Sequence, residues 1–203
     1  MKKSLKIVKD AFKREYQNRG SAEYLGVIAA TQRSHLYTPN NDNRDIRQEW
    51  EHQLRLLSEK YINECQSYEV FLQDIVDLKR HMNDTFADRF INGRQGFDNE
   101  FRIAHAQKSL SICLKHLWVR GELGNHCPPV CPIDGIVLKH ARCYDSWTKV
   151  NSMGDRIIEA GNLQRGYNTH LNIVREAAKR EHYSCLAEWE LIVWWENKHK
   201  VGK

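Results

Sequence analysis

Apolar residues recur at α-helical spacing along almost the whole chain, and this pattern constrains the fold more than any other feature of the sequence. In the segment from Arg44 to Cys65, for example, Ile46, Trp50 and Leu54 fall on one side of a helix. No stretch shows the alternation of apolar and polar residues that is typical of a half-buried strand. The pattern predicts an all-α fold, with helices over residues 3–18, 22–32, 44–65, 68–90, 101–119, 133–141, 157–159, 169–183 and 186–197.

The length of the chain favours one compact domain. A chain of 203 residues can bury one sizeable core, and no stretch reads as a linker. We therefore expect a single multi-helix domain over residues 1–203, most simply a monomer. Within it we distinguish a helical lobe at about 1–95, a segment of possible chemistry at 101–143 and C-terminal helices at 151–198. Two helical lobes with a cleft between them would fit this division.

Charge and cysteine content bear on location and partners. The net charge of +5 favours an anionic partner such as DNA without requiring one. No run approaches the roughly 20 apolar residues that a membrane span needs. After two initial lysines, charge returns at Lys6, Lys9 and Asp10 before an export signal could form, so we expect a cytoplasmic protein. The six cysteines are then expected to be free thiols.

One loop concentrates the turn-forming residues of the chain. Three of the four prolines lie between Gly121 and Pro132, and the sequence Pro132-Ile133-Asp134-Gly135 follows directly. Asp134 is placed to cap the next helix, because aspartate is a preferred N-cap residue. A constrained loop of this kind could also hold the carboxylate as a catalytic acid or as an electrostatic stabiliser. A simple capping role is the alternative.

The helix predicted over residues 101–119 has an apolar side and a cationic side. If its leucines face the core, the opposite surface carries Arg102, His105, Lys108, Ser109, Lys115 and His116. Lys108 lies near the start of this helix, where the helix dipole and neighbouring cations disfavour an ammonium group. Partial burial would therefore make Lys108 a nucleophilic amine. The alternative is that this side is ordinary solvated surface.

These residues resemble the active-site segment of a known family. Gln107-Lys108-Ser109-Leu110, then Leu114-Lys115-His116-Leu117-Trp118, a proline-bearing loop and Pro132-Ile133-Asp134 are similar to the corresponding segment of helix-hairpin-helix DNA glycosylases, and most of all to the archaeal 8-oxoguanine type. The resemblance covers about a fifth of the chain. The glycine-rich hairpin that usually precedes the lysine in this family is replaced here by residues 101–106.

The resemblance implies an activity and a role for two residues. Lys108 would attack the sugar C1′ of a flipped nucleotide, and Asp134 would stabilise the positive charge that develops there. The implied activity is excision of a modified or damaged base. If Lys108 forms a Schiff base with the opened sugar, a lyase step would accompany excision. The reaction needs no cofactor, and no iron-sulfur spacing of cysteines is present.

The same hypothesis assigns residues to the base and to the DNA backbone. Residues that could contact a flipped base are Gln107, Trp118, Tyr144 and Trp147. Residues that could contact phosphates are Arg102, His105, Lys115, Arg120 and Lys139. For each aromatic residue, packing within the core is the alternative.

Two further interpretations stay open. We predict no metal, although His126, Cys127, Cys131 and Cys143 offer four soft ligands that could bind zinc. The alternative function is a non-catalytic, basic helical module that binds nucleic acid or takes part in regulation or phage defence. In that case the lysines contact phosphates, and each contributes about equally to the binding affinity.

Overall fold

The computed structural model describes residues 4–32, 36–37, 43–91, 99–158 and 162–200 of the chain. Their helices are α1 (Leu5–Tyr16), α2 (Ala22–Thr31), α3 (Arg44–Asn63), α4 (Tyr68–Phe86), α5 (Ile103–Arg120), α6 (Gly135–His140), α7 (Tyr167–Arg180) and α8 (Leu186–Lys200), with short 3-10 turns η1 (Ala87–Arg89) and η2 (Trp147–Lys149). Two short strands, β1 (Arg156–Ile157) and β2 (Leu163–Gln164), form an antiparallel pair. The predicted all-α fold is confirmed.

One predicted element is wrong. The sequence suggested a short helix over residues 157–159, whereas Ile157 pairs with Leu163 in the β1–β2 hairpin. Glu159, at the end of that predicted helix, lies outside the described residues. A strand of two residues contains a single alternation, so periodicity could not reveal it.

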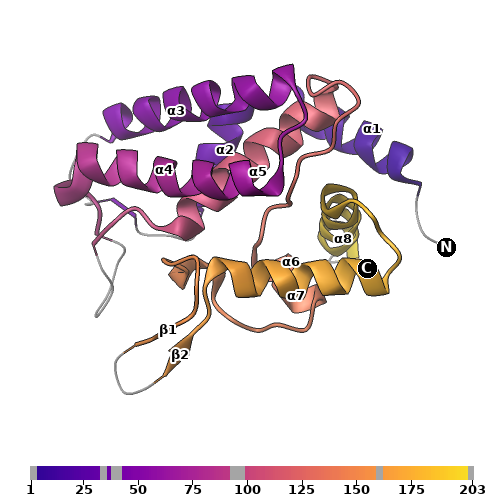
Figure 1. The fold of residues 1–203 in the computed structure, drawn as a ribbon. Coiled ribbons are helices and arrows are strands. Elements are labelled where there is room, and N and C mark those ends of the chain that lie inside the picture. The colour runs from indigo at the N-terminus through magenta and orange to yellow at the C-terminus, as the bar shows by residue number, and fades with distance from the viewer. Residues whose placement is uncertain (1–3, 33–35, 38–42, 92–98, 159–161, 201–203) are drawn as a thin grey trace.

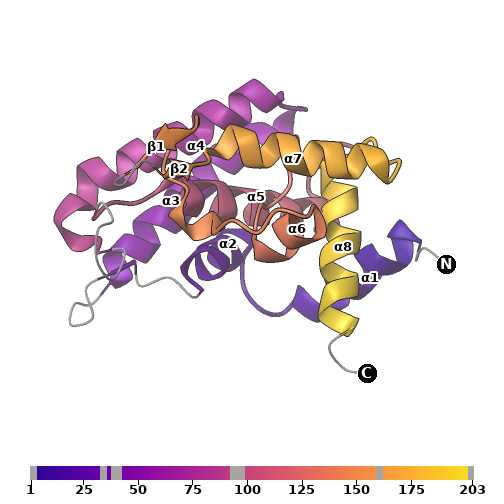
Figure 2. The same cartoon turned by 90° about the horizontal axis from the view of Figure 1, so that it is seen from below.

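The helices form two groups, which Figures 1 and 2 show from the side and from below. The first group contains α1 to α5, and the second contains α6 to α8 with the hairpin. The chain passes from one to the other through residues 121–134, after Gly121 ends α5 in the left-handed conformation with φ of 89°. Helix α8 also packs against α1, so the first and last helices contact each other across the groups.

Helix α5 is the centre of the structure. Every residue from Ile103 to Val119 is buried, and α5 contacts α1, α2, α3 and α4. Its approach to α2 is closest at Gly26, where a Cβ atom would lie only 2.5 Å from the carbonyl oxygen of Ser109. Glycine at this position therefore allows the two helices to pack backbone against backbone.

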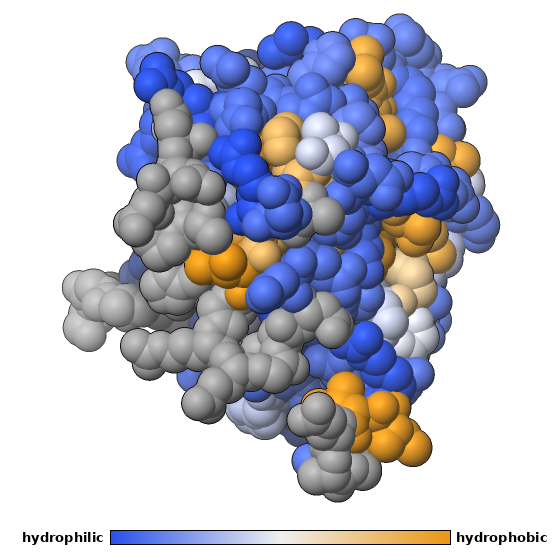
Figure 3. Space-filling model, turned by 90° about the vertical axis from the view of Figure 1, so that its left-hand side faces the viewer, coloured by the Kyte–Doolittle hydropathy of each residue, from blue (hydrophilic) through white to orange (hydrophobic). Residues whose placement is uncertain are grey.

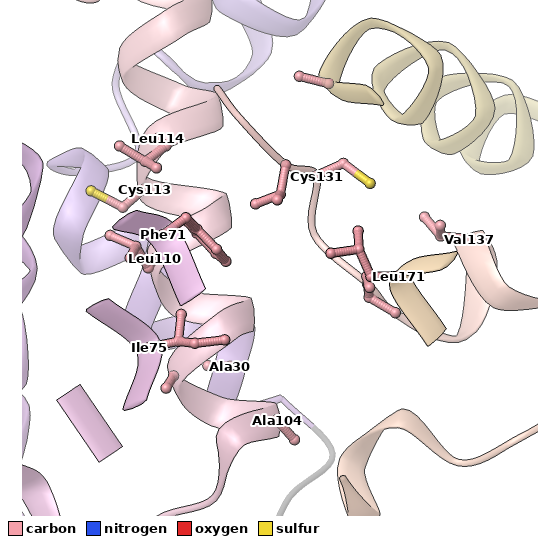
Figure 4. Packing of buried hydrophobic residues seen from close by; sticks show 14 of the residues in the cluster. Ala30, Phe71, Ile75, Ala104, Leu110, Cys113, Leu114, Cys131, Val137 and Leu171 are labelled. Atoms are coloured by element: carbon pink, nitrogen blue, oxygen red, sulfur yellow. The ribbon is translucent and has the colours of Figure 1, made fainter. Parts of the chain in front are cut away.

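The two groups share one hydrophobic core. Leu110 of α5 and Phe71 of α4 belong to the same buried cluster as Cys131, Val137 and Leu171 from the other side of the molecule. Figure 4 shows these side chains between the helices. Apolar packing thus fills this part of the space between the two groups.

The surface is mostly hydrophilic on the face shown in Figure 3, with small hydrophobic areas between the polar side chains. Apolar residues exposed on the β1–β2 hairpin include Ile157 and Leu163. Among the described residues, no helix combines the length and the apolar character that crossing a bilayer requires.

Candidate active site

Lys108 and Asp134 meet, as the resemblance required. Lys108 projects from α5 and Asp134 precedes α6, and the Nζ and Oδ2 atoms lie 2.6 Å apart. The other carboxylate oxygen of Asp134 accepts hydrogen bonds from the backbone N–H groups of Ile136, at 2.9 Å, and Val137, at 3.1 Å. The predicted N-cap role of Asp134 is confirmed, and the same carboxylate also holds the lysine.

The environment keeps Asp134 ionised. Burial alone would raise the pKa of its carboxyl, but the Lys108 ammonium and the backbone N–H of Val137 outweigh burial and hold the pKa below its ordinary value. The Lys108 and Asp134 side chains are 8% and 12% exposed, so little of the pair reaches solvent.

Gln107 ties the proline-bearing loop to α5. Its side-chain amide donates to the carbonyl of Ile133 at 2.9 Å and accepts from the N–H of Ile133 at 3.2 Å. This double contact positions Asp134, the next residue, opposite Lys108. Because the backbone already occupies both atoms of the amide, Gln107 acts here as a positioning residue and does not present a free group to a base.

Trp147 borders the pair, whereas Trp118 does not. The Lys108 ammonium lies 5.8 Å from the centre of the Trp147 ring, which is half-buried. Trp118 is only 5% exposed, and Lys9 of α1 lies 3.9 Å from the centre of its ring. The assignment of Trp118 to a base pocket is therefore wrong in this conformation, because packing with α1 covers its ring.

The expectation of a solvated cationic face on α5 is wrong. Arg102, His105 and Lys115 are 5%, 1% and 2% exposed, so none of them can meet a DNA phosphate in this conformation. The second group of helices contacts Lys108 and Lys115 on this side of α5, and α1 packs against His116. The amphipathic pattern could not show these contacts. The polar side chains of Arg102, His105 and Lys115 form hydrogen bonds or ion pairs with other groups of the protein.

Arg102 and His105 stabilise the start of α5. The His105 Nδ1 atom accepts the backbone N–H of Arg102 at 3.2 Å, and the Arg102 guanidinium donates to the carbonyl of Thr148 at 3.0 Å. Burial, aided by the Arg102 charge, lowers the pKa of His105 to about 3. His105 is therefore neutral at physiological pH.

Lys115 forms a second buried ion pair, with Glu190 of α8. The Lys115 ammonium lies 2.9 and 3.1 Å from the two carboxylate oxygens, and the side chains are 2% and 0% exposed. Burial raises the pKa of Glu190 against the pull of the Lys115 charge. We did not predict Glu190 from the sequence, but a single acid within the apolar run Trp189-Glu190-Leu191 was a signal that a buried cation would face it.

The remaining predicted residues lie nearer the surface. Arg120 is half-buried and donates to the carbonyl of Gly20 at 2.8 Å. Lys139 on α6 is exposed, and Tyr144 is 80% exposed in the segment that follows. Lys139 and Tyr144 are thus accessible, and they belong to the same stretch of chain as Asp134 and Trp147.

The four predicted soft ligands are divided between two places. The Cys127 sulfur lies with Cys185 and Glu188, and the Cys143 sulfur lies with Asp145 and His170; in each group the donor atoms are within 4.8 Å of one another. Cys131 and His126 are in neither group. The Cys143 group could supply three zinc ligands, but Arg165 donates to both Cys143, at 3.8 Å, and Asp145, at 3.0 Å. The Arg165 guanidinium would therefore compete with a metal ion for two of these three ligands.

Searches of known protein families, curated proteins and solved structures found no match for this chain.

Proposed function

We propose that this protein is a DNA N-glycosylase that excises a modified or damaged base, with Lys108 and Asp134 as the catalytic residues. The observation that carries the proposal is the meeting of these two groups. They are 26 residues apart in the chain, and their side chains lie 2.6 Å from each other at the start of α6. A lysine next to a fixed carboxylate is the arrangement that attack on a sugar carbon with loss of the base requires.

Each group has a defined task in this reaction. The nitrogen of Lys108 forms a bond to the sugar C1′ while the bond from C1′ to the base breaks. The base leaves with the proton that the Lys108 ammonium gives up through Asp134, so the carboxylate is anionic again. To attack, Lys108 must first lose a proton, and Asp134 is already hydrogen-bonded to that ammonium. Asp134 remains beside the sugar as positive charge develops, and its two backbone N–H bonds keep it in place.

A nucleotide can reach the pair only if neighbouring side chains move. Exposed fractions of 8% and 12% leave no room for a sugar in the closed form. The half-buried ring of Trp147 borders Lys108 and could turn outward to stack on a flipped base. Tyr144 and Lys139 are exposed nearby and would contact the strand and its phosphates.

Trapping with borohydride tests the amine. The wild-type chain is incubated with duplexes that carry oxidised, deaminated or alkylated bases, beginning with 8-oxoguanine, and reduction should link the protein covalently to the opened sugar. Lys108→Arg should abolish this adduct, because arginine keeps the ion pair with Asp134 but has no nucleophilic amine. Lys139→Gln, which removes an exposed cation from α6, should leave the adduct intact and weaken DNA binding only modestly.

Base release provides the second measurement. Asp134→Asn keeps an N-cap but removes the charge, and it should slow release by about 100-fold or more if the carboxylate stabilises the transition state. The proposal is wrong if the wild-type chain neither forms an adduct nor releases a base from any duplex in the panel.

A non-catalytic nucleic-acid-binding module is the second candidate. The burial of the Lys108–Asp134 ion pair favours it, because a structural ion pair would have the same geometry and would also be closed to a nucleotide. In that case Lys108→Arg binds DNA like the wild type, and affinity falls steeply with salt through exposed cations such as Lys139.

A further inference from the structure

A pocket outside the Lys108 site brings two thiols together. Cys127 comes from the proline-bearing loop and Cys185 from the residue that precedes α8. Their sulfur atoms and a carboxylate oxygen of Glu188 lie within 4.8 Å of one another. Both cysteines are free, both are partly exposed, and both line the same pocket of about 380 Å³. The thiols are therefore close to each other and open to a small molecule.

The start of α8 favours a thiolate at Cys185. The backbone N–H groups of Ala187 and Glu188 point to its sulfur, so the thiol occupies the position of a helix N-cap. The hydrogen bond from Cys127, together with these two N–H groups, lowers the pKa of Cys185 to about 7, although burial and the Glu188 charge oppose this. The pKa of Cys127 is raised, because Cys127 holds its proton in the bond to Cys185.

The charges around the pocket suit an anionic reactant. Arg175 and Lys179 of α7 line it, and Lys9 of α1 acts on Cys127 from the other side. The Arg175 guanidinium is stacked 4.0 Å from the centre of the Tyr68 ring, which fixes its position. Glu188 is the acid closest to the thiols. A small disulfide with carboxylate groups would find both a nucleophile and countercharges here.

We propose that Cys127 and Cys185 form a redox-active pair that exchanges with low-molecular-weight, anionic disulfides. The Cys185 thiolate attacks one sulfur of the reactant, forming a mixed disulfide and releasing the first thiolate, which takes the proton of Cys127. The Cys127 thiolate then attacks the Cys185 sulfur, releases the second thiolate and closes the Cys127–Cys185 bond; water protonates this last leaving group. The protein loses two electrons, and the reactant disulfide is reduced to two thiols.

Variants of the full chain separate the two roles, with oxidised glutathione as the probe. The wild-type chain should give a disulfide between the peptides that contain Cys127 and Cys185, detected by mass spectrometry after alkylation of the remaining thiols. Cys127→Ser should stop at the first step and accumulate glutathione on Cys185, because serine can donate the same hydrogen bond but cannot resolve the mixed disulfide. Cys185→Ser should give neither product at this pair.

Cys65 provides the matched control, because it is exposed and lines the same pocket. Cys65→Ser should leave the Cys127–Cys185 disulfide unchanged. With iodoacetamide at pH 7, Cys185 should react about fivefold faster than the thiol of glutathione, since its larger thiolate fraction exceeds the loss of nucleophilicity that a lower pKa brings. The Cys185 rate should rise with pH through a midpoint near 7.

Two results would overturn the proposal. One is a wild-type chain that stays reduced at Cys127 and Cys185 in excess oxidised glutathione. The other is a chain purified with one equivalent of zinc that Cys127→Ser and Cys185→Ser both release, which would make the thiols structural metal ligands. Circular dichroism of each variant shows whether a missing product reflects a loss of folding.

Discussion

The ionisable residues of α5 are held in the interior by specific partners. Lys108 and Lys115 are paired with Asp134 and Glu190, at 2.6 and 2.9 Å respectively. A buried ion pair adds little net stability compared with well-packed apolar residues, but loss of one partner leaves an uncompensated charge. His105 avoids this cost by remaining neutral, since burial lowers its pKa to about 3.

Acid should destabilise the fold through His105 and His116. Burial lowers the pKa of each imidazole from 6.5 to about 3. The unfolded chain therefore binds protons below pH 6.5 that the folded chain refuses, so stability is complete above that pH and falls as the pH drops from 6.5 towards 3. At pH 5.5 each histidine should lower the free energy of unfolding by about 1.4 kcal/mol relative to its value above pH 6.5.

Urea unfolding at pH 7.5 and pH 5.5 measures this loss. His105→Gln keeps a side-chain acceptor for the Arg102 N–H and should remove about half of the loss attributed to the two histidines. His52 is exposed, so His52→Gln serves as the control. Between pH 7.5 and pH 5.5 this variant should lose as much stability as the wild type does. An unchanged pH dependence in His105→Gln would show that His105 is already protonated in the folded chain.

The spacing of apolar residues predicted where the helices lie in the sequence, but it did not predict what each face of a helix packs against. The bounds of α2 and α3 differ from the predicted ones by one or two residues at their ends. The alternating chemistry of α5, with leucines on one side and cations on the other, was interpreted as core and solvent. In the structure both sides are buried, and the cationic side faces α1 as well as the second group of helices. Periodicity identifies a polar face without showing what covers it.

The contact between α2 and α5 depends on Gly26. Gly26→Ala places a Cβ atom 2.5 Å from the Ser109 carbonyl oxygen, which forces the helices apart. Alanine's better helix propensity, worth about 1 kcal/mol, should not offset an overpacking cost of about 1–3 kcal/mol with a displaced backbone. We expect a net loss of stability of up to about 2 kcal/mol by urea unfolding.

Gly135→Ala serves as the comparison, because the new Cβ at the start of α6 would meet only Trp147 Cδ1, at an ordinary 3.9 Å. This variant should be as stable as the wild type or slightly more stable. Equal stabilities for the two alanine variants would mean that α2 and α5 can separate at little cost.

At the scale of the whole molecule, contacts from α5 join the two groups of helices. Gln107 and Lys108 hold the segment before α6, and Lys115 holds α8. The sequence predicted the meeting of Lys108 and Asp134 only through a resemblance, because nothing in local spacing brings residues 108 and 134 together. The pairing of Lys115 with Glu190, 75 residues away, had no local signal beyond an acid in an apolar helix. Long-range pairs of this kind depend on how the groups pack.

Replacing Lys115 tests how strongly this packing depends on charge. Lys115→Met fills the same volume but leaves Glu190 buried without a cation, so unfolding free energy at pH 7 should fall by about 3–5 kcal/mol. The loss should shrink as the pH is lowered, because the raised pKa of Glu190 allows the carboxyl to take a proton instead. Lys115→Met with Glu190→Leu removes both charges and should recover most of the stability, since Phe12 and Trp194 already surround Lys115 at 5.3 and 5.0 Å. A double variant as unstable as the single one would mean that the ion pair itself, and not the cost of an unpaired carboxylate, holds α8 against α5.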